Sequence, residues 1–406
     1  MRTAGYSDIS IILTTFFLKS IGLWVAEDRA QKRRVKMLFA YSIFNTASGL
    51  IVSTRDLYFT WLTKGDTLYA VTNILTVLMA LLKICIILMH KTKFMDLLEY
   101  VGQNFLNVEY DFYEKQIFDH CKTTCIVLIS GVTTIGILSM ISYVVSPIVA
   151  SIGVNESDRL LPFNVWLDLP LSNTPYYEIL FTTQTISMYF VATCYFCFDN
   201  ALCIMSVHGA GQFRILQYRL TKLFDLNPQK CGKNAYLSSA EYADKSYEKL
   251  KDCIQQHQAL IEYYEKLENV YTMITLGQVI IFSVLICLFG YQVLLAECSF
   301  ARRLIFVWLI IGSMGLLFMF TYSCDVVIEQ SENVTLGAYS AQWTVMPMNK
   351  SGRMIRNDLI MVVARSRRVC CLTAYGFFPV SLETYTKILS TAASYFTLLR
   401  NHLEES

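Results

Sequence analysis

Polar side chains recur at helical spacing in the last apolar stretch of the chain, Leu372 to Leu399. They follow one another at steps of four and three residues, which places them in one stripe along a helix. The stripe consists of Glu383, Lys387, Ser390, Ser394, Thr397 and Asn401. The opposite side carries Tyr385, Ile388, Leu389, Ala392, Tyr395, Phe396 and Leu399. In a helix that crosses a membrane, such a stripe is expected to face a partner, a cavity or a pore.

Two charged residues, Glu383 and Lys387, open this stripe. At a spacing of four residues, with the acid first, they are able to pair on one helix face. An ion pair in hydrocarbon is costly unless it is satisfied, so we expect the two side chains to face water or a partner. The sequence leaves open whether they attract cations or neutralise one another, and it favours a structural role.

The composition is that of a membrane protein. Hydrophobic residues make up 54% of the chain and charged residues 16%, whereas soluble domains are about 45–50% apolar and about 25% charged. The apolar residues form runs about as long as the 20 or so residues that cross a hydrocarbon core. These runs are 35–62, 67–90, 124–150, 177–206, 268–296, 302–324 and 372–399. The sequence therefore predicts an all-α membrane protein with seven transmembrane helices.

Basic residues alternate between the connections and so indicate the orientation. A cluster stands just before the first span: Arg29, Lys32, Arg33, Arg34 and Lys36. Connections rich in Lys and Arg stay in the cytoplasm, and the 2–3, 4–5 and 6–7 connections are the other basic ones. We therefore expect a cytoplasmic amino terminus and an extracellular carboxyl terminus. Asn155-Glu156-Ser157 is a glycosylation acceptor in the 3–4 connection, which this topology places outside.

Amphipathic patterns extend the predicted spans into the cytoplasm. Between Leu250 and Leu267, apolar residues recur every three or four positions, which indicates a helix that continues into the fifth span. We expect helices 4 to 7 to extend into a cytoplasmic anchor region, which is either a self-contained cap or a subunit interface. The predicted segments are a cytoplasmic amino-terminal segment (1–34), transmembrane helices 1–4 (35–206), a helical anchor extension (207–267), transmembrane helices 5–6 (268–324), a second anchor segment (325–371), transmembrane helix 7 (372–399) and a short extracellular tail (400–406).

Two motifs near the carboxyl end carry a family resemblance. Tyr375-Gly376-Phe377-Phe378-Pro379-Val380-Ser381-Leu382, followed by Ser394-Tyr395-Phe396-Thr397-Leu398-Leu399, resembles the carboxyl-terminal signature of insect odorant receptors. The resemblance implies an odorant-binding tuning subunit of a ligand-gated, non-selective cation channel. It also implies a heterotetramer with the co-receptor Orco, in the plasma membrane of olfactory neuron dendrites. In this family the cytoplasmic helices form the anchor and the last helix of each subunit lines the pore.

The resemblance assigns a gate to the seventh helix. The family's hydrophobic constriction near the outer end of this helix matches Leu398, at the edge of the polar stripe. Hydrophobic constrictions close a pore by dewetting. A second constriction position falls on His402, where the family has an aliphatic residue. The expected pore and gate residues are Thr391, Ser394, Thr397, Leu398, Asn401 and His402. The alternative for Leu398 is packing against lipid or a neighbour, and Pro379 is expected to break the helix near its start.

The resemblance also implies a ligand pocket in the outer half of each subunit, walled by spans two to six. A small, mostly apolar volatile organic ligand suits aromatic and methionine walls with one or two hydrogen-bonding groups. The candidates are Asn73, Met140, Tyr143, Gln184, Met188, Tyr189 and Trp308. Ordinary helix packing is the alternative for each of these residues.

Motifs of other functional classes are missing from the sequence. It has no phosphate-binding glycine loop, no HExxH and no nucleophile elbow, and its five histidines have no metal-ligand spacing. We therefore expect no enzyme activity, no cofactor and no metal, and the basic connections indicate topology and not a nucleic-acid surface. The alternatives are a gustatory receptor of the same superfamily, a secondary transporter, or a G-protein-coupled receptor. The loop charges oppose the last, and so does the presence of a single cysteine, Cys298, in the predicted external connections.

Overall fold

The computed structural model describes residues 8–24, 28–63, 67–152, 159–163, 173–223, 239–296, 299–346 and 348–405. Within these ranges the chain is helical and contains no β-sheet. The α-helices are α1 (Ile9–Ser20), α2 (Arg29–Leu62), α3 (Thr67–Met89), α4 (Lys91–Val101), α5 (Phe112–Ala150), α6 (Tyr176–Thr221), α7 (Ser239–Leu294), α8 (Phe300–Ser340), α9 (Lys350–Ser366) and α10 (Leu382–Glu405). A π-helical turn (Gly102–Leu106) follows α4, and a 3₁₀ turn (Trp343–Val345) precedes α9.

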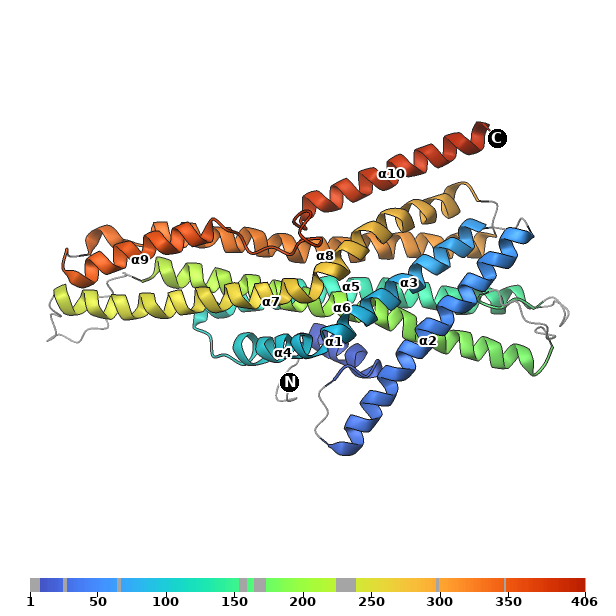
Figure 1. The fold of residues 1–406 in the computed structure, drawn as a ribbon, viewed down its shortest axis with the longest axis horizontal. Coiled ribbons are helices and arrows are strands. Elements are labelled where there is room, and N and C mark those ends of the chain that lie inside the picture. Colours follow the sequence, from blue (N-terminus) through green and yellow to red (C-terminus); the bar gives the residue numbers. More distant parts are fainter. Residues whose placement is uncertain are drawn as a thin grey trace.

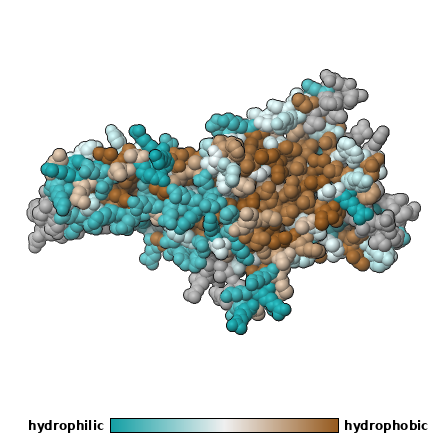
Figure 2. Space-filling model, viewed as in Figure 1, coloured by the Kyte–Doolittle hydropathy of each residue, from teal (hydrophilic) through white to brown (hydrophobic). Residues whose placement is uncertain are grey.

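The molecule is elongated and divides into an apolar half and a polar half. Among the described residues, α2, α3, α5, α6, α7 and α8 are long and apolar enough to cross a membrane. Figure 2 shows apolar side chains gathered over one half and hydrophilic side chains over the other. Figure 1 places α9 and the first part of α7 in the polar half. The protein is therefore an all-helical membrane protein with a polar helical extension.

The ends of the predicted spans that lie away from the polar half agree closely with the helices. The first predicted span ends where α2 ends, at residue 62, and the second, 67–90, coincides with α3. The helix ends in the polar half run further than the apolar runs, since α6 continues to Thr221, α7 begins at Ser239 and α8 continues to Ser340. The predicted continuation of an amphipathic helix into the fifth span is thus confirmed by α7.

The last predicted span is wrong over its first ten residues. Residues 372–381 form a tight hairpin, in which Thr373 and Pro379 make an isolated antiparallel bridge. Tyr375 and Gly376 adopt positive φ angles of 52° and 79° at its tip, a conformation that an α-helix cannot contain. The helix starts only after Pro379, which lacks the N–H that a helix interior requires. The polar stripe also keeps α10 from being apolar enough to count among the six long apolar helices.

Helix α6 forms the centre of the bundle. Every side chain from Cys197 to Phe213 is buried, because α5, α7 and α8 all pack against it. Three tyrosines of α7 donate their hydroxyls to α6 carbonyls: Tyr263 to Met205 (3.1 Å), Tyr264 to Ser206 (3.0 Å) and Tyr271 to Phe198 (3.0 Å). Gly209 permits this approach, since a Cβ there would collide with the Tyr264 hydroxyl.

Candidate functional site

Helix α10 has one packed face and one exposed face, as its sequence pattern predicts. Ile388 and Ala392 are buried against the bundle, where α10 contacts α7 and α8. The exposed stripe begins with an ion pair of 2.6 Å between Lys387 Nζ and Glu383 Oε1, whose side chains are 72% and 73% exposed. Tyr395, which the sequence places on the side opposite the polar stripe, is 52% exposed. Figure 1 shows α10 leaving the side of the bundle at an angle.

The expected pore residues whose side chains the structure describes lie on the exposed side of α10. Leu398 is 68% exposed, and Asn401 is exposed as well. Three hydroxyls donate to carbonyls one turn earlier in the same helix: Thr391 to Lys387 (2.8 Å), Ser394 to Ser390 (2.9 Å) and Thr397 to Ala393 (2.9 Å). The side chains of Leu399 and His402 lie outside the described residues. The hydroxyl protons of these three residues are used within the helix, so they present mainly hydroxyl oxygen outward, next to the Asn401 amide.

The hairpin before α10 fixes the start of this helix to α7 and α8. The Asp325 carboxylate of α8 accepts the Leu382 N–H at 3.1 Å and so caps the first turn of α10 from another helix. Glu268 of α7 accepts the Thr373 hydroxyl at 2.6 Å. The Thr272 hydroxyl donates to the Thr373 carbonyl (3.1 Å) and accepts the Tyr375 N–H (2.9 Å). The position of α10 therefore depends on side chains of two other helices.

Two of the predicted pocket residues meet at the connection before α6. The Gln184 side chain accepts the Phe163 N–H at 3.0 Å and donates to the Phe163 carbonyl at 2.9 Å. The Tyr143 ring stacks on the Phe163 ring, with centroids 5.4 Å apart. Gln184 thus holds a loop segment over the bundle while Tyr143 supports it from α5. The sequence did not indicate Phe163.

The other predicted pocket residues are half-buried, as are Tyr143 and Gln184. They are Asn73, Met140, Met188, Tyr189 and Trp308. Within the described residues, no hydrogen bond or ring contact joins them to Tyr143 or Gln184. Partial burial is consistent with a wall position and with helix packing alike. The predicted glycosylation residue Asn155 lies outside the described residues.

An aromatic cluster near the same end of the bundle was not predicted. The Phe306 ring of α8 contacts the rings of Tyr69 (6.0 Å) and Phe289 (6.1 Å), from α3 and α7. The Arg302 guanidinium lies 5.1 Å from the centroid of the Tyr69 ring. A cation over an aromatic ring is a cation–π contact, which stabilises this end of α8 against α3.

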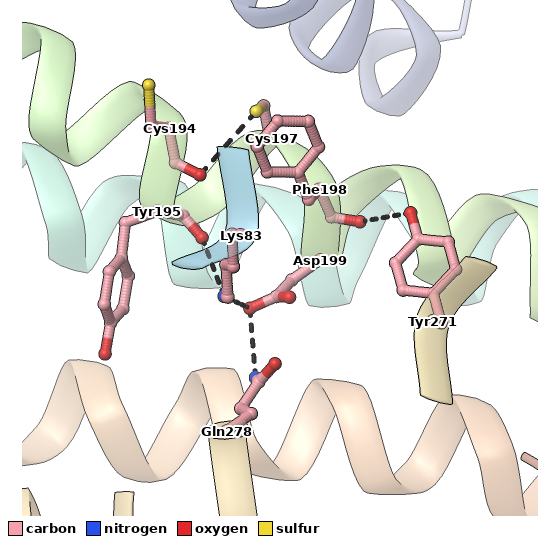
Figure 3. A network of polar contacts seen from close by, with 8 residues as sticks. All are labelled: Lys83, Cys194, Tyr195, Cys197, Phe198, Asp199, Tyr271 and Gln278. Atoms are coloured by element: carbon pink, nitrogen blue, oxygen red, sulfur yellow. Dashed lines mark hydrogen bonds and ion pairs between the residues drawn. The ribbon is translucent and has the colours of Figure 1, made fainter. Parts of the chain in front are cut away.

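A buried polar network joins three helices inside the apolar half (Figure 3). Lys83 Nζ of α3 lies 2.7 Å from Asp199 Oδ2 of α6, and both side chains are fully buried. The same carboxylate oxygen accepts from Gln278 of α7 at 3.1 Å, and Lys83 also donates to the Tyr195 carbonyl at 3.1 Å. The Lys83 ammonium lies 4.7 Å from the centroid of the Tyr195 ring.

Sequence reasoning missed this network although a signal was available. Lys83 is an ionisable residue inside the run 67–90, and Asp199 lies inside the run 177–206. A charged residue within a membrane span is functional or paired by default, because an isolated charge there is costly. Apolar runs locate the spans, but they do not indicate which of the residues that interrupt them lie side by side.

A small cleft lies in the polar half between α4, α6 and α7. It has a volume of about 230 Å³ and is lined in part by Tyr110, Gln212, Arg219 and Gln256. Gln212 donates to the Tyr110 hydroxyl at 2.7 Å, and Arg219 pairs with Glu114 at 2.7 Å. Burial raises the pKa of Tyr110 to about 12, against the opposing effect of the Gln212 hydrogen bond. These contacts brace the helices. Among the described residues, no group of three or more His, Cys, Asp or Glu side chains is placed to hold a metal ion.

Comparisons with known proteins assign the family. The family model described as "7tm Odorant receptor" matches residues 65–393. Odorant receptor 13a of Drosophila melanogaster is 30% identical over 218 residues, which are 52% of this chain and 50% of that receptor. Odorant receptor Or2 of Anopheles gambiae is 26% identical over 244 residues, 60% of this chain and 61% of that receptor. The chain thus matches about half to three fifths of the length of these relatives.

Solved structures show the same fold. The structure of the insect olfactory receptor OR5 from Machilis hrabei aligns with a TM-score of 0.76, at 15% identity, over 97% of this chain and 99% of that one. The same receptor in complex with eugenol aligns with a TM-score of 0.77. The fold and the family model agree with the resemblance of the carboxyl-terminal motifs. The chain belongs to the insect odorant receptor family, a family of non-enzymatic membrane receptors.

Proposed function

We propose that this chain is the odorant-binding tuning subunit of an odorant-gated, non-selective cation channel formed with the co-receptor Orco. The observation that carries the proposal is the exposed polar stripe of α10, whose apolar face packs against α7 and α8. A stripe that begins with an ion pair and continues with hydroxyls is costly in hydrocarbon. In an assembly of several subunits, the α10 helices would turn these stripes toward a shared, water-filled axis.

The proposed topology has seven spans, with α10 as the seventh. The amino terminus lies in the cytoplasm and the carboxyl terminus outside, at the plasma membrane of olfactory neuron dendrites. Support comes from the exposed basic cluster at the start of α2 and from the polar half formed by α9 and parts of α7 and α8. In this topology the polar half is the cytoplasmic anchor, and Asn155 is available for glycosylation.

The proposed gate is Leu398, followed outward by Asn401 and His402 and preceded by Thr397, Ser394 and Thr391. Leu398 is an exposed apolar side chain beside a polar stripe. A ring of such side chains would exclude water from a narrow passage when the helices are close together. Separation of the helices would let the neighbouring hydroxyls and amides support a hydrated cation.

The proposed ligand pocket lies in the outer half of the bundle. Tyr143 and Gln184 define one side of it through their contacts with Phe163. The remaining candidates are Asn73, Met140, Met188, Tyr189 and Trp308. The solved relative in complex with eugenol holds a small aromatic odorant, which agrees with a small, mostly apolar ligand that is bound chiefly through burial.

Electrophysiology on cells that express this chain with Orco tests the proposal. A panel of volatile compounds should evoke currents carried by both sodium and potassium, and this chain without Orco should give little current. Robust odorant-evoked currents from this chain alone would contradict the heteromeric assignment. An amino-terminal epitope tag that antibodies reach on intact cells would contradict the topology.

A further inference from the structure

The start of α2 presents a one-sided group of cations. Arg29, Lys32, Arg33, Arg34 and Lys36 are all exposed, and within the described ranges none has an acidic partner. At about 100° per residue, Arg29, Lys32, Arg33 and Lys36 fall within an arc of about 100° on the helix surface, and Arg34 falls outside it. Figure 2 shows a hydrophilic projection where Figure 1 places the start of α2.

The connection from α1 holds this part of α2 in place. Gly22 has a φ of 76° and lies so close to α2 that a Cβ would collide with the Val35 carbonyl oxygen. One turn further along α2, the Lys91 ammonium lies 4.8 Å from the centroid of the Phe39 ring. The basic face therefore lies next to a part of α2, Val35 to Phe39, that packs against the rest of the protein.

Helix α1 adds an apolar face that is about half exposed. Ile9, Ile12 and Phe16 recur at three- and four-residue spacing and are exposed, while the other side of α1 packs against α5 and α6. The last turn of α1 carries Lys19, whose ammonium lies 4.8 Å from the centroid of the Trp24 ring. An exposed apolar stripe followed by Lys and Trp is typical of a helix in the membrane interface.

We propose that α1 and the start of α2 form a binding surface for anionic phospholipid headgroups of the cytoplasmic leaflet. The stripe of Ile9, Ile12 and Phe16 would lie on acyl chains, and the basic face of α2 would lie at the level of the phosphates. Each Lys or Arg near an anionic surface strengthens binding by about fivefold. The proposal rests on the cytoplasmic amino terminus of the proposed topology, and it is independent of pore formation.

The test measures lipid binding by the purified full-length chain. The chain, in micelles of a neutral detergent and phosphatidylcholine, is titrated with a fluorescent phosphatidylinositol 4,5-bisphosphate, and anisotropy reports binding. The variant Arg33→Gln/Lys36→Gln should weaken binding about 25-fold, from about fivefold for each residue. Arg34→Gln, on another face of the same helix turn, should weaken it less than twofold. The variant Lys350→Gln/Arg353→Gln, at exposed cations of α9, should leave it unchanged.

Micelles expose both ends of the protein, so the result does not depend on the direction of membrane insertion or on channel activity. Wild-type binding by the Arg33→Gln/Lys36→Gln variant would overturn the proposal, and so would an equal loss in the α9 variant. An equal loss for Arg34→Gln would overturn the assignment to one helix face. A tag test on intact cells reports separately on the topology, so failure of the lipid surface and failure of the proposed function remain distinguishable.

Discussion

Lys83 of α3 and Asp199 of α6 form an ion pair of 2.7 Å, and both side chains are fully buried. Gln278 of α7 donates to the same carboxylate, so one oxygen of Asp199 connects three helices. A pair of this kind adds little net stability compared with apolar residues of the same shape. The loss of one partner, however, leaves an uncompensated charge in an apolar surrounding.

Replacement of one member of this pair should therefore lower the free energy of unfolding more than replacement of both. Lys83→Met should lower the free energy of unfolding by about 3–5 kcal/mol, because it leaves the Asp199 carboxylate without its cation. Lys83→Met/Asp199→Leu should recover most of the loss. The thermal midpoint of the detergent-solubilised chain, followed by size-exclusion chromatography after heating, measures both effects. Lys115→Met, at an exposed lysine of α5, controls for the loss of one positive charge. A thermal midpoint of the double variant that is no higher than that of Lys83→Met would contradict the pairing.

The proposed gate predicts a gain of basal current. Leu398→Ser should raise the odorant-independent conductance of the complex with Orco, since a hydroxyl lowers the cost of water in the constriction. Tyr395→Ser is the matched control, because Tyr395 is also an exposed, largely apolar side chain on α10 but lies outside the polar stripe. Whole-cell recordings without odorant compare the variants. Equal basal currents in Leu398→Ser and wild type, with an unchanged odorant response, would contradict a gate at this position.

The cap that Asp325 provides on α10 predicts that its removal increases hydrogen exchange at the start of this helix. Asp325→Ala removes the acceptor of the Leu382 N–H and should destabilise the first turn of α10 by about 1 kcal/mol, as loss of a helix cap does. Asp325→Asn retains a carbonyl oxygen as acceptor and should keep most of the protection of this turn from hydrogen exchange. Hydrogen exchange followed by mass spectrometry of peptides covering 372–386 reports the effect. Equal exchange in Asp325→Ala and wild type would show that the hairpin is held by its contacts with α7 alone.

The contacts of Gln184 predict a change in odorant sensitivity. Gln184→Ala removes two hydrogen bonds to the Phe163 backbone, each with a net contribution of about 0.5–1.5 kcal/mol. The half-maximal odorant concentration should rise about tenfold while the basal current stays the same. Thr183→Ala is the control, since the exposed Thr183 hydroxyl bonds only within α6. An unchanged concentration dependence in Gln184→Ala would place the odorant away from this segment.

Periodicity and composition predict most of this fold, because they report directly on burial. The apolar runs locate the ends of the long helices that lie away from the polar half, and the amphipathic pattern from Leu250 to Leu267 predicts the continuation of α7. The two faces of α10 follow from the same reasoning. The hairpin at 372–381 could not be found in this way, since its hydrophobicity resembles that of a span. Its shape comes from Gly376, Pro379 and side chains of distant helices.

Contacts between residues that are distant in the sequence could not be predicted from this single sequence. Phe163 became identifiable only when the fold brought it between Tyr143 and Gln184. Asp325 lies 57 positions before the N–H that it caps. Lys83 and Asp199 were visible as interruptions of apolar runs, but three-dimensional proximity was needed to join them. The predicted pocket residues are all partly buried, and their place in the wall of a ligand pocket stays a prediction.

The three tyrosines that α7 inserts against α6 restrict how this protein can move. Their donors and acceptors run in opposite directions along two antiparallel helices, which fixes the register of the pair. A slide of α7 along α6 by one helical turn, about 5.4 Å, would break all three hydrogen bonds together. We therefore expect α6 and α7 to move together as one rigid unit. A tilt of α10 relative to these two helices would therefore require backbone rotation in the hairpin at 372–381.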